Sequence, residues 1–175
     1  MRTYLSRLRT ALPDCSITTR PAGYLLDVNG SALDIDEFDG LLTQAEASVP
    51  DRALDLYDEA LRLWRGDTFG EFAGEWWALP ETARLRERRM VADLGRAEAR
   101  IAMGHHDRAI PDLERLVVEH PLDERPVTLL VQALQATGRQ AASMRAAHAF
   151  RVRLGEETGL EPSRALARLE ASVAA

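Results

Sequence analysis

The sequence contains no lysine, and all 22 basic residues are arginine. A P-loop binds phosphates with a Gly-Lys-Ser/Thr segment, so that nucleotide site is excluded, as is Schiff-base catalysis by lysine. The single cysteine, Cys15, excludes an internal disulfide and is typical of a reducing compartment. No apolar run approaches the roughly 20 residues that a transmembrane helix needs, and the N-terminal residues lack the apolar core of a secretory signal. We therefore expect a cytoplasmic protein that does not associate with membranes.

Charge is distributed unevenly along the 175 residues. Residues 1–20 carry four arginines and one acid, a net charge of +3, whereas the remaining 155 residues carry 18 arginines and 27 acids, a net charge of −9. A positive end on a negative body is typical of an element that binds a polyanion, joined to a module that binds protein. Chance over a short window is the alternative explanation.

Most of the chain has the periodicity of amphipathic helices. Phe38, Leu41, Leu42 and Ala45 follow one another at i, i+3, i+4 and i+7, which is the spacing of one helix face. Similar patterns, punctuated by glycine and proline, recur to the end of the sequence. The predicted helices begin near Asp34 or Asp36, at Pro50, at Pro80, near residue 105, at Asp123, at Arg139 and at Ser163.

An internal repeat organises the second half of the chain. Gly104 and Gly138 lie 34 residues apart, and each separates one predicted helix from the next. Ala109 and Ala142 follow them at nearly the same offset, as small residues do where two helices cross closely. This period is that of the tetratricopeptide repeat. We therefore predict an all-α fold, a tetratricopeptide-like bundle of about seven helices, with an irregular helical bundle as the alternative.

Residues that could carry catalysis or bind a metal do not form a convincing site. His105 and His106 are adjacent, so on a helix they point about 100° apart and cannot share one metal ion as an i, i+4 pair does. Cys15 has no histidine near it in the sequence to activate it. Acids such as Glu87 and Asp93 alternate with arginines, a pattern typical of solvated, salt-bridged helix surfaces. We expect no enzyme, no metal and no cofactor.

Three tryptophans, Trp64, Trp76 and Trp77, lie within fourteen residues that include a segment with three glycines. One interpretation is that they pack the first helix pair against the long helix that follows. The other is a partner-binding surface, because tryptophan is enriched where proteins bind one another.

The first 28 residues predict a basic helix and a β-hairpin. Leu5, Leu8 and Leu12 form an apolar stripe, and the strands Ser16–Arg20 and Tyr24–Val28 are joined by Pro-Ala-Gly. Such a helix can enter the major groove of DNA while the hairpin reaches phosphate or the minor groove. A solvated amphipathic helix is the alternative. The candidate DNA-contacting residues are Arg2, Tyr4, Arg7 and Arg9 on the helix and Arg20 at the hairpin tip.

The segment YLSRLRTALPDCSITTRPAGYLLDV resembles the C-terminal half of a winged helix of the response-regulator type, a recognition helix followed by a wing. The resemblance implies DNA contact by Thr19 as well, a glycine-dependent wing turn at Gly23, and a core anchor at Tyr24. The next segment, with ALDLYDEALRLWRGDTFGEF, resembles the bacterial transcriptional activator domain that follows the winged helix in SARP-type (antibiotic regulatory protein) activators.

These resemblances imply two domains, a winged-helix remnant at residues 1–29 and a helical activator domain at residues 30–175. In that family the winged helix binds promoter DNA, and the helical domain supports dimerisation and contacts RNA polymerase. The sheet and the first two helices of a complete winged helix have no counterpart in the sequence. We therefore expect an N-terminally shortened chain that binds promoter DNA weakly, with its Leu5–Leu12 stripe uncovered.

Two other functions fit the same features. The helical region could be a tetratricopeptide-like scaffold that holds a peptide. Alternatively, the chain could be a regulator deficient in DNA binding that forms heterodimers with related full-length regulators.

Overall fold

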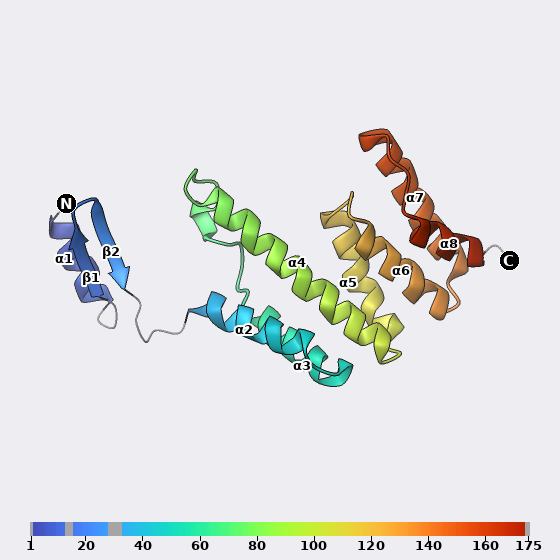
Figure 1. Ribbon diagram of the computed structural model, residues 1–175, viewed down its shortest axis with the longest axis horizontal. Coiled ribbons are helices and arrows are strands. Elements are labelled where there is room, and N and C mark those ends of the chain that lie inside the picture. Colours follow the sequence, from blue (N-terminus) through green and yellow to red (C-terminus); the bar gives the residue numbers. More distant parts are fainter. Residues whose placement is uncertain (1, 13–15, 28–32, 174–175) are drawn as a thin grey trace. The chain divides into compact units, whose positions relative to one another are not determined.

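The computed structural model of the chain describes residues 2–12, 16–27 and 33–173 (Figure 1). Contacts divide the chain into an N-terminal unit, residues 1–37, and a helical unit, residues 38–175. The boundary falls in the first turn of helix α2. Across the described ranges, no helix combines the length and the apolar character needed to cross a bilayer.

The N-terminal unit contains a helix and a two-stranded antiparallel hairpin, as predicted. Its elements are α1 (Arg2–Ala11), β1 (Ser16–Arg20) and β2 (Gly23–Asp27). Arg20 pairs with Gly23, so the turn consists of Pro21 and Ala22 alone, and Gly23 belongs to the second strand rather than to the turn. Gly23 has φ +148°, a conformation that glycine adopts readily and other residues avoid. Val28, the predicted end of the second strand, lies outside the described residues.

Seven α-helices follow the hairpin within the described residues, which confirms the predicted number. Consecutive helices pack in turn, α3 on α4, α4 on α5, α5 on α6 and α6 on α7, in the tetratricopeptide-like arrangement of Figure 1. The elements are α2 (Asp34–Glu46), α3 (Pro50–Arg62), a 3₁₀ turn η1 (Gly70–Phe72), α4 (Leu79–Ala102), α5 (His106–Glu119), α6 (Glu124–Ala136), α7 (Gln140–Thr158) and α8 (Arg164–Val173).

The repeat predicted from Gly104 and Gly138 corresponds to equivalent helix ends. Both glycines have left-handed backbones, with φ +77° and +74°, just after α4 and α6 respectively. The start of α6 is capped by Asp123, whose side chain accepts a hydrogen bond from the amide of Arg125. Pro111 lies inside α5, in its second turn, and the helix continues past it to Glu119.

The core of the helical unit is built from the stripes that the sequence predicts. Phe38, Leu113 and Phe150 are almost fully buried, on α2, α5 and α7. Helices α3 and α4 approach closely where Gly95 faces Tyr57, because a Cβ atom on Gly95 would lie 2.3 Å from Cζ of the tyrosine ring. An alanine methyl group at position 95 therefore fits only if the Tyr57 ring moves.

Candidate functional site

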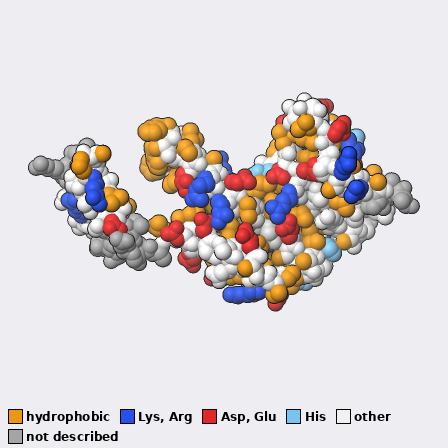
Figure 2. Space-filling view, viewed as in Figure 1, with side chains coloured by type: hydrophobic (Ala, Val, Ile, Leu, Met, Phe, Trp, Pro, Cys, Tyr) orange, Lys and Arg blue, Asp and Glu red, His pale blue; other side chains and the backbone are white. Residues whose placement is uncertain are grey.

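The residues predicted to contact DNA lie at the surface of the N-terminal unit. The side chains of Tyr4, Arg7 and Arg9 on α1 and of Thr19 and Arg20 on β1 are exposed, whereas that of Arg2 lies outside the described residues. Figure 2 shows arginine side chains on the visible face of this unit. Their accessibility is what a phosphate-binding surface requires, and DNA contact by these residues stays a prediction.

Arg9 also has a role within the N-terminal unit. Its Nη2 donates a hydrogen bond of 2.7 Å to the backbone carbonyl oxygen of Ile17, which joins α1 to β1. A guanidinium group carries five N–H donors, so this bond leaves others for a phosphate. The contact sets where the basic helix lies against the hairpin.

Apolar side chains of the N-terminal unit are largely exposed. Leu8 on α1 and Tyr24 on β2 are each 47% exposed, and Leu12, Leu25 and Leu26 are exposed as well. The expectation that Tyr24 anchors the hairpin to a core is therefore wrong for this structure. The described unit has one helix and two strands, which offer no second layer to cover both faces of the hairpin.

Trp64 is used in packing within the helical unit. It lies two residues after the end of α3, and its ring meets Phe38 edge to face, with ring centroids 5.5 Å apart. The guanidinium carbon of Arg89, on α4, lies 5.3 Å from the same ring, a cation–π distance. Trp64 therefore seals the first helices against α4, as the packing interpretation predicts.

Trp76 and Trp77 lie at the surface instead, just before α4. Trp76 is 80% exposed and Trp77 is 50% exposed, so the packing interpretation is wrong for this pair. Trp77 contacts the rings of Phe69 and Phe72 at centroid distances of 5.8 Å and 6.3 Å. Phe69, Phe72, Trp76 and Trp77 form what we name the aromatic cluster, and in Figure 2 hydrophobic side chains gather at this end of α4.

Sequence reasoning missed Phe69 and Phe72. Both lie in the segment where glycines break the helical periodicity, and so no face could be assigned to them. Phe69 is the one non-glycine residue with positive φ in the described part of the chain, at φ +61°. The signal available in the sequence was the density of aromatic residues in a segment rich in glycine.

A network of ion pairs joins α3, α4 and α5. Asp93 on α4 is 3% exposed and lies 2.9 Å from Arg115 and 3.1 Å from Arg96. Arg96 continues the network to Asp112 at 3.1 Å and to Asp58 at 3.4 Å. The expectation of a solvated surface is therefore wrong for Asp93, because the neighbouring helices cover it. The network fixes the helices relative to one another.

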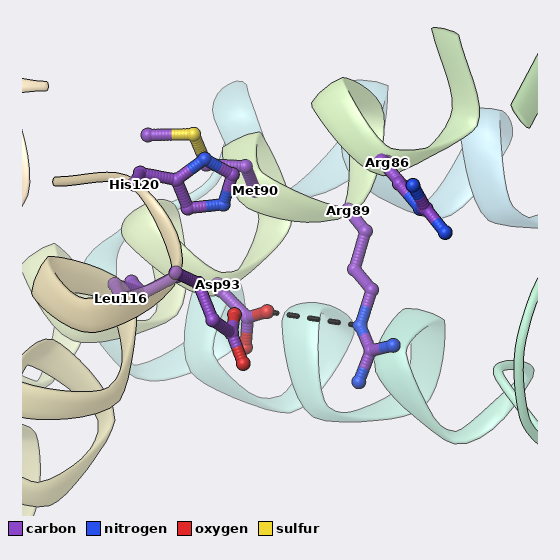
Figure 3. A pocket seen from close by; sticks show the side chains of 7 residues that line it. Arg86, Arg89, Met90, Asp93, Leu116 and His120 are labelled. Atoms are coloured by element: carbon purple, nitrogen blue, oxygen red, sulfur yellow. Dashed lines mark ion pairs between the residues drawn. The ribbon is translucent and has the colours of Figure 1, made fainter. Parts of the chain in front are cut away.

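A cavity of about 250 Å³ opens beside this network (Figure 3). Its lining carries charges of both signs, and Arg89 forms an ion pair of 3.9 Å with Asp93, drawn as a dashed line. The carboxylate of Asp93 is already paired with Arg89, Arg96 and Arg115. The cavity is lined by Arg86, Arg89, Met90, Asp93, Leu116, Glu119 and His120.

Metal-binding side chains do not converge in the described part of the chain. In those ranges no three His, Cys, Asp or Glu side chains are grouped so that they could hold a metal ion. His105 and His106 lie where α5 begins, at the turn after α4. Cys15 lies outside the described residues.

Comparisons with known proteins identify the helical unit. Residues 33–174 match the family described as the bacterial transcriptional activator domain. Regulatory protein AfsR of Streptomyces griseus is 34% identical over 97% of this chain and 18% of its own length. Transcriptional regulator RedD of Streptomyces coelicolor is 35% identical over 87% of this chain and 45% of its own length.

A solved structure has the same fold. Mycobacterium tuberculosis EmbR in complex with low affinity phosphopeptide gives a TM-score of 0.86 at 25% sequence identity, covering 99% of this chain and 48% of EmbR. The chain thus spans less than half the length of AfsR, RedD and EmbR. The chain belongs to the bacterial transcriptional activator domain family of SARP-type regulators.

Proposed function

We propose that the chain is the activator part of a SARP-type transcriptional regulator, and that the helical unit acts by contact with other proteins. The observation that carries this proposal is the match of residues 33–174 to the bacterial transcriptional activator domain. The exposed tryptophans Trp76 and Trp77 support it, since exposed aromatic side chains are suited to protein contact. The proposed partners are RNA polymerase and a second regulator chain, identical or related, in the cytoplasm.

The N-terminal unit is proposed to be the recognition helix and wing of a winged helix. Arg7 and Arg9, with Arg2 and Tyr4, would face DNA from α1, and Thr19 and Arg20 would do so from the hairpin. Because Leu8 on α1 and Leu12 just after it are exposed, this unit lacks the packing that would hold the helix firmly in a groove. We therefore propose that the chain alone binds promoter DNA weakly and mostly without sequence preference.

Co-purification with RNA polymerase tests the activator role. Tagged full chain is mixed with purified bacterial RNA polymerase, and we expect the polymerase to be retained at stoichiometric levels. A chain that captures no polymerase subunit contradicts the polymerase contact. Retention of a full-length related regulator in its place would favour the heterodimer, and retention of neither would favour the peptide-holding scaffold.

DNA binding measured against salt tests the N-terminal unit. Each phosphate neutralised contributes a slope of about −0.9 to the logarithm of the binding constant against the logarithm of salt concentration. We expect a slope of small magnitude for the parent chain. The slope should come still closer to zero when Arg7 and Arg20 are both replaced by glutamine. Tight, sequence-specific binding by this chain would contradict weak DNA binding.

A further inference from the structure

The connection between α3 and α4 is the longest one in the helical unit, residues 63–78. The other connections contain three to five residues and mark simple changes of direction. This one presents the aromatic cluster, all four of whose rings are at least 41% exposed. Proteins rarely leave so many large apolar side chains together at the surface, and such patches mark interaction sites.

Ring contacts hold three members of the aromatic cluster, Phe69, Phe72 and Trp77, in a defined arrangement. Trp77 lies between Phe69 and Phe72, at an interplanar angle of 68° to the first and 38° to the second. Trp76 extends furthest into solvent. A surface whose rings already pack on one another loses less conformational freedom when a partner binds.

The backbone at Phe69 indicates that its side chain is needed where it lies. A left-handed conformation, here φ +61° and ψ +7°, is unfavourable for phenylalanine and freely available to glycine. Gly70 follows with φ +51°, so the turn already uses glycine at the neighbouring position. Residues with an unfavourable backbone conformation are found more often at binding sites, where the contacts of the side chain offset the conformational cost.

Every charged side chain within residues 66–79, the segment that carries the aromatic cluster, is acidic. Residues 66–79 include Asp67, Glu71 and Glu75 and no basic residue. All three acids are exposed. Carboxylates around an apolar surface favour a partner that brings positive charge and apolar side chains together.

We propose that the aromatic cluster binds a basic, apolar segment of a partner protein, with the partner's aliphatic side chains on the rings and its arginines or lysines against Asp67, Glu71 and Glu75. The inference rests on the proposed function, in which the helical unit works by protein contact. Nucleic acid is disfavoured because its phosphates would meet carboxylates. A second copy is disfavoured because each chain carries a net charge of −6.

Three synthetic peptides of equal length probe the site. The first is an amphipathic helix with a leucine face and arginine flanks, the second has glutamate in place of arginine, and the third has serine in place of leucine. Fluorescence anisotropy of labelled peptide is measured with the full chain at low salt. We expect the first peptide to bind at least about tenfold more tightly than the other two, as a contact that uses both apolar and charged groups requires.

Variants of the full chain locate the binding. Trp76→Ala is expected to weaken binding of the first peptide by about tenfold, as truncation of a tryptophan at a binding site does. Val118→Ala, a residue on α5 that is 79% exposed, is the matched control and should leave binding unchanged. Glu71→Gln combined with Glu75→Gln should weaken binding of the first peptide several-fold. Raising the salt concentration should weaken binding to the parent chain by about the same factor, because salt screens the same charges. Circular dichroism melting checks that each variant is folded.

Several results would overturn the inference. If the acidic and the basic peptide bind equally well, the three acids do not select a basic partner. If Trp76→Ala binds the first peptide as tightly as the parent does, the aromatic cluster is not the binding site. Self-association in sedimentation that Trp76→Ala abolishes would make a second copy the occupant. If the parent and Trp76→Ala retain RNA polymerase equally, the inference about the aromatic cluster is wrong, whereas the proposed function still holds. If RNA polymerase is not retained but the chain still prefers the first peptide, the proposed polymerase contact is wrong, whereas the inference about the aromatic cluster still holds.

Discussion

The two units of this chain use similar side chains in opposite ways. In the helical unit Phe38 and Phe150 are 1% and 2% exposed, because each helix has neighbours on its apolar side. In the N-terminal unit Leu8 and Tyr24 are each 47% exposed, although they lie on a helix and a strand with regular geometry. Local sequence is therefore sufficient to form these elements, and a second layer is what buries them.

The contrast extends to charged residues. Asp93 is buried in the helical unit and surrounded by arginines, whereas Arg7, Arg9 and Arg20 of the N-terminal unit lie at the surface. A buried charge needs partners that an accessible charge does not. Stability should therefore be concentrated in the helical unit, and the N-terminal unit should contribute to binding rather than to stability.

The largest expected effect distinguishes the packed core of the helical unit from the exposed apolar residues of the N-terminal unit. Phe150→Ala should lower the free energy of unfolding by about 3–5 kcal/mol, because it leaves a cavity where the ring was enclosed. Leu25→Ala, on the exposed β2 strand, should lower it by less than about 0.5 kcal/mol. Urea denaturation followed by far-ultraviolet circular dichroism measures both. Similar losses in the two variants would show that the N-terminal unit has a core of its own.

The second prediction concerns the buried ion pairs. Asp93→Asn should lower the free energy of unfolding by about 3 kcal/mol, because Arg96 and Arg115 lose their shared carboxylate in a covered position. Glu81→Gln is the control, since Glu81 pairs with Arg84 at the surface, and it should leave the denaturation midpoint unchanged. A change in Asp93→Asn no larger than in the control would mean that water still reaches this network.

The third prediction tests the close approach of α3 and α4. Gly95→Ala should lower the free energy of unfolding by about 1–3 kcal/mol, because the added methyl group overlaps the Tyr57 ring. Gly40→Ala on α2, where nothing lies within 4 Å of the new Cβ, should raise it by about 0.5–1 kcal/mol through helix propensity. Combining Gly95→Ala with Tyr57→Leu should recover part of the loss, and strict additivity would contradict the overlap.

Much of the helical unit could be predicted from the sequence because glycine and proline punctuate it. The helix predicted to begin at Pro80 is α4, Leu79–Ala102, and the one predicted to begin at Arg139 is α7, Gln140–Thr158. Both helices are long and are bounded by glycine or proline in the sequence, so local signals indicate their type and where they begin.

Features that depend on distant neighbours could not be predicted in this way. Trp76 and Trp77 follow a segment without periodicity, where the general preference of tryptophan for burial was misleading. The spacing of Asp93 among arginines resembles a solvated surface, and only the position of α5 shows that it is covered. The same holds for Phe69, whose left-handed backbone leaves no mark in the sequence.

The smallest expected effect appears only in alkaline solution and depends on Tyr57. Burial raises the pKa of Tyr57, and the nearby carboxylates of Glu46 and Glu98 raise it further, with partial compensation by Arg125. The unfolded chain therefore loses this proton first, so the stability that the neutral ring provides is complete below about pH 10 and is lost as pH rises through the higher folded pKa.

Because the chain has no lysine, few other groups titrate in that range, and the dependence can be assigned to tyrosine. Denaturation midpoints of the parent should fall between about pH 10 and 12. Tyr57→Phe should flatten this dependence, whereas Tyr24→Phe, on the exposed hairpin, should follow the parent. A parent and a Tyr57→Phe variant that fall in parallel would show that the ring does not resist ionisation in the fold, and that α3 and α4 admit water where the core is expected to exclude it.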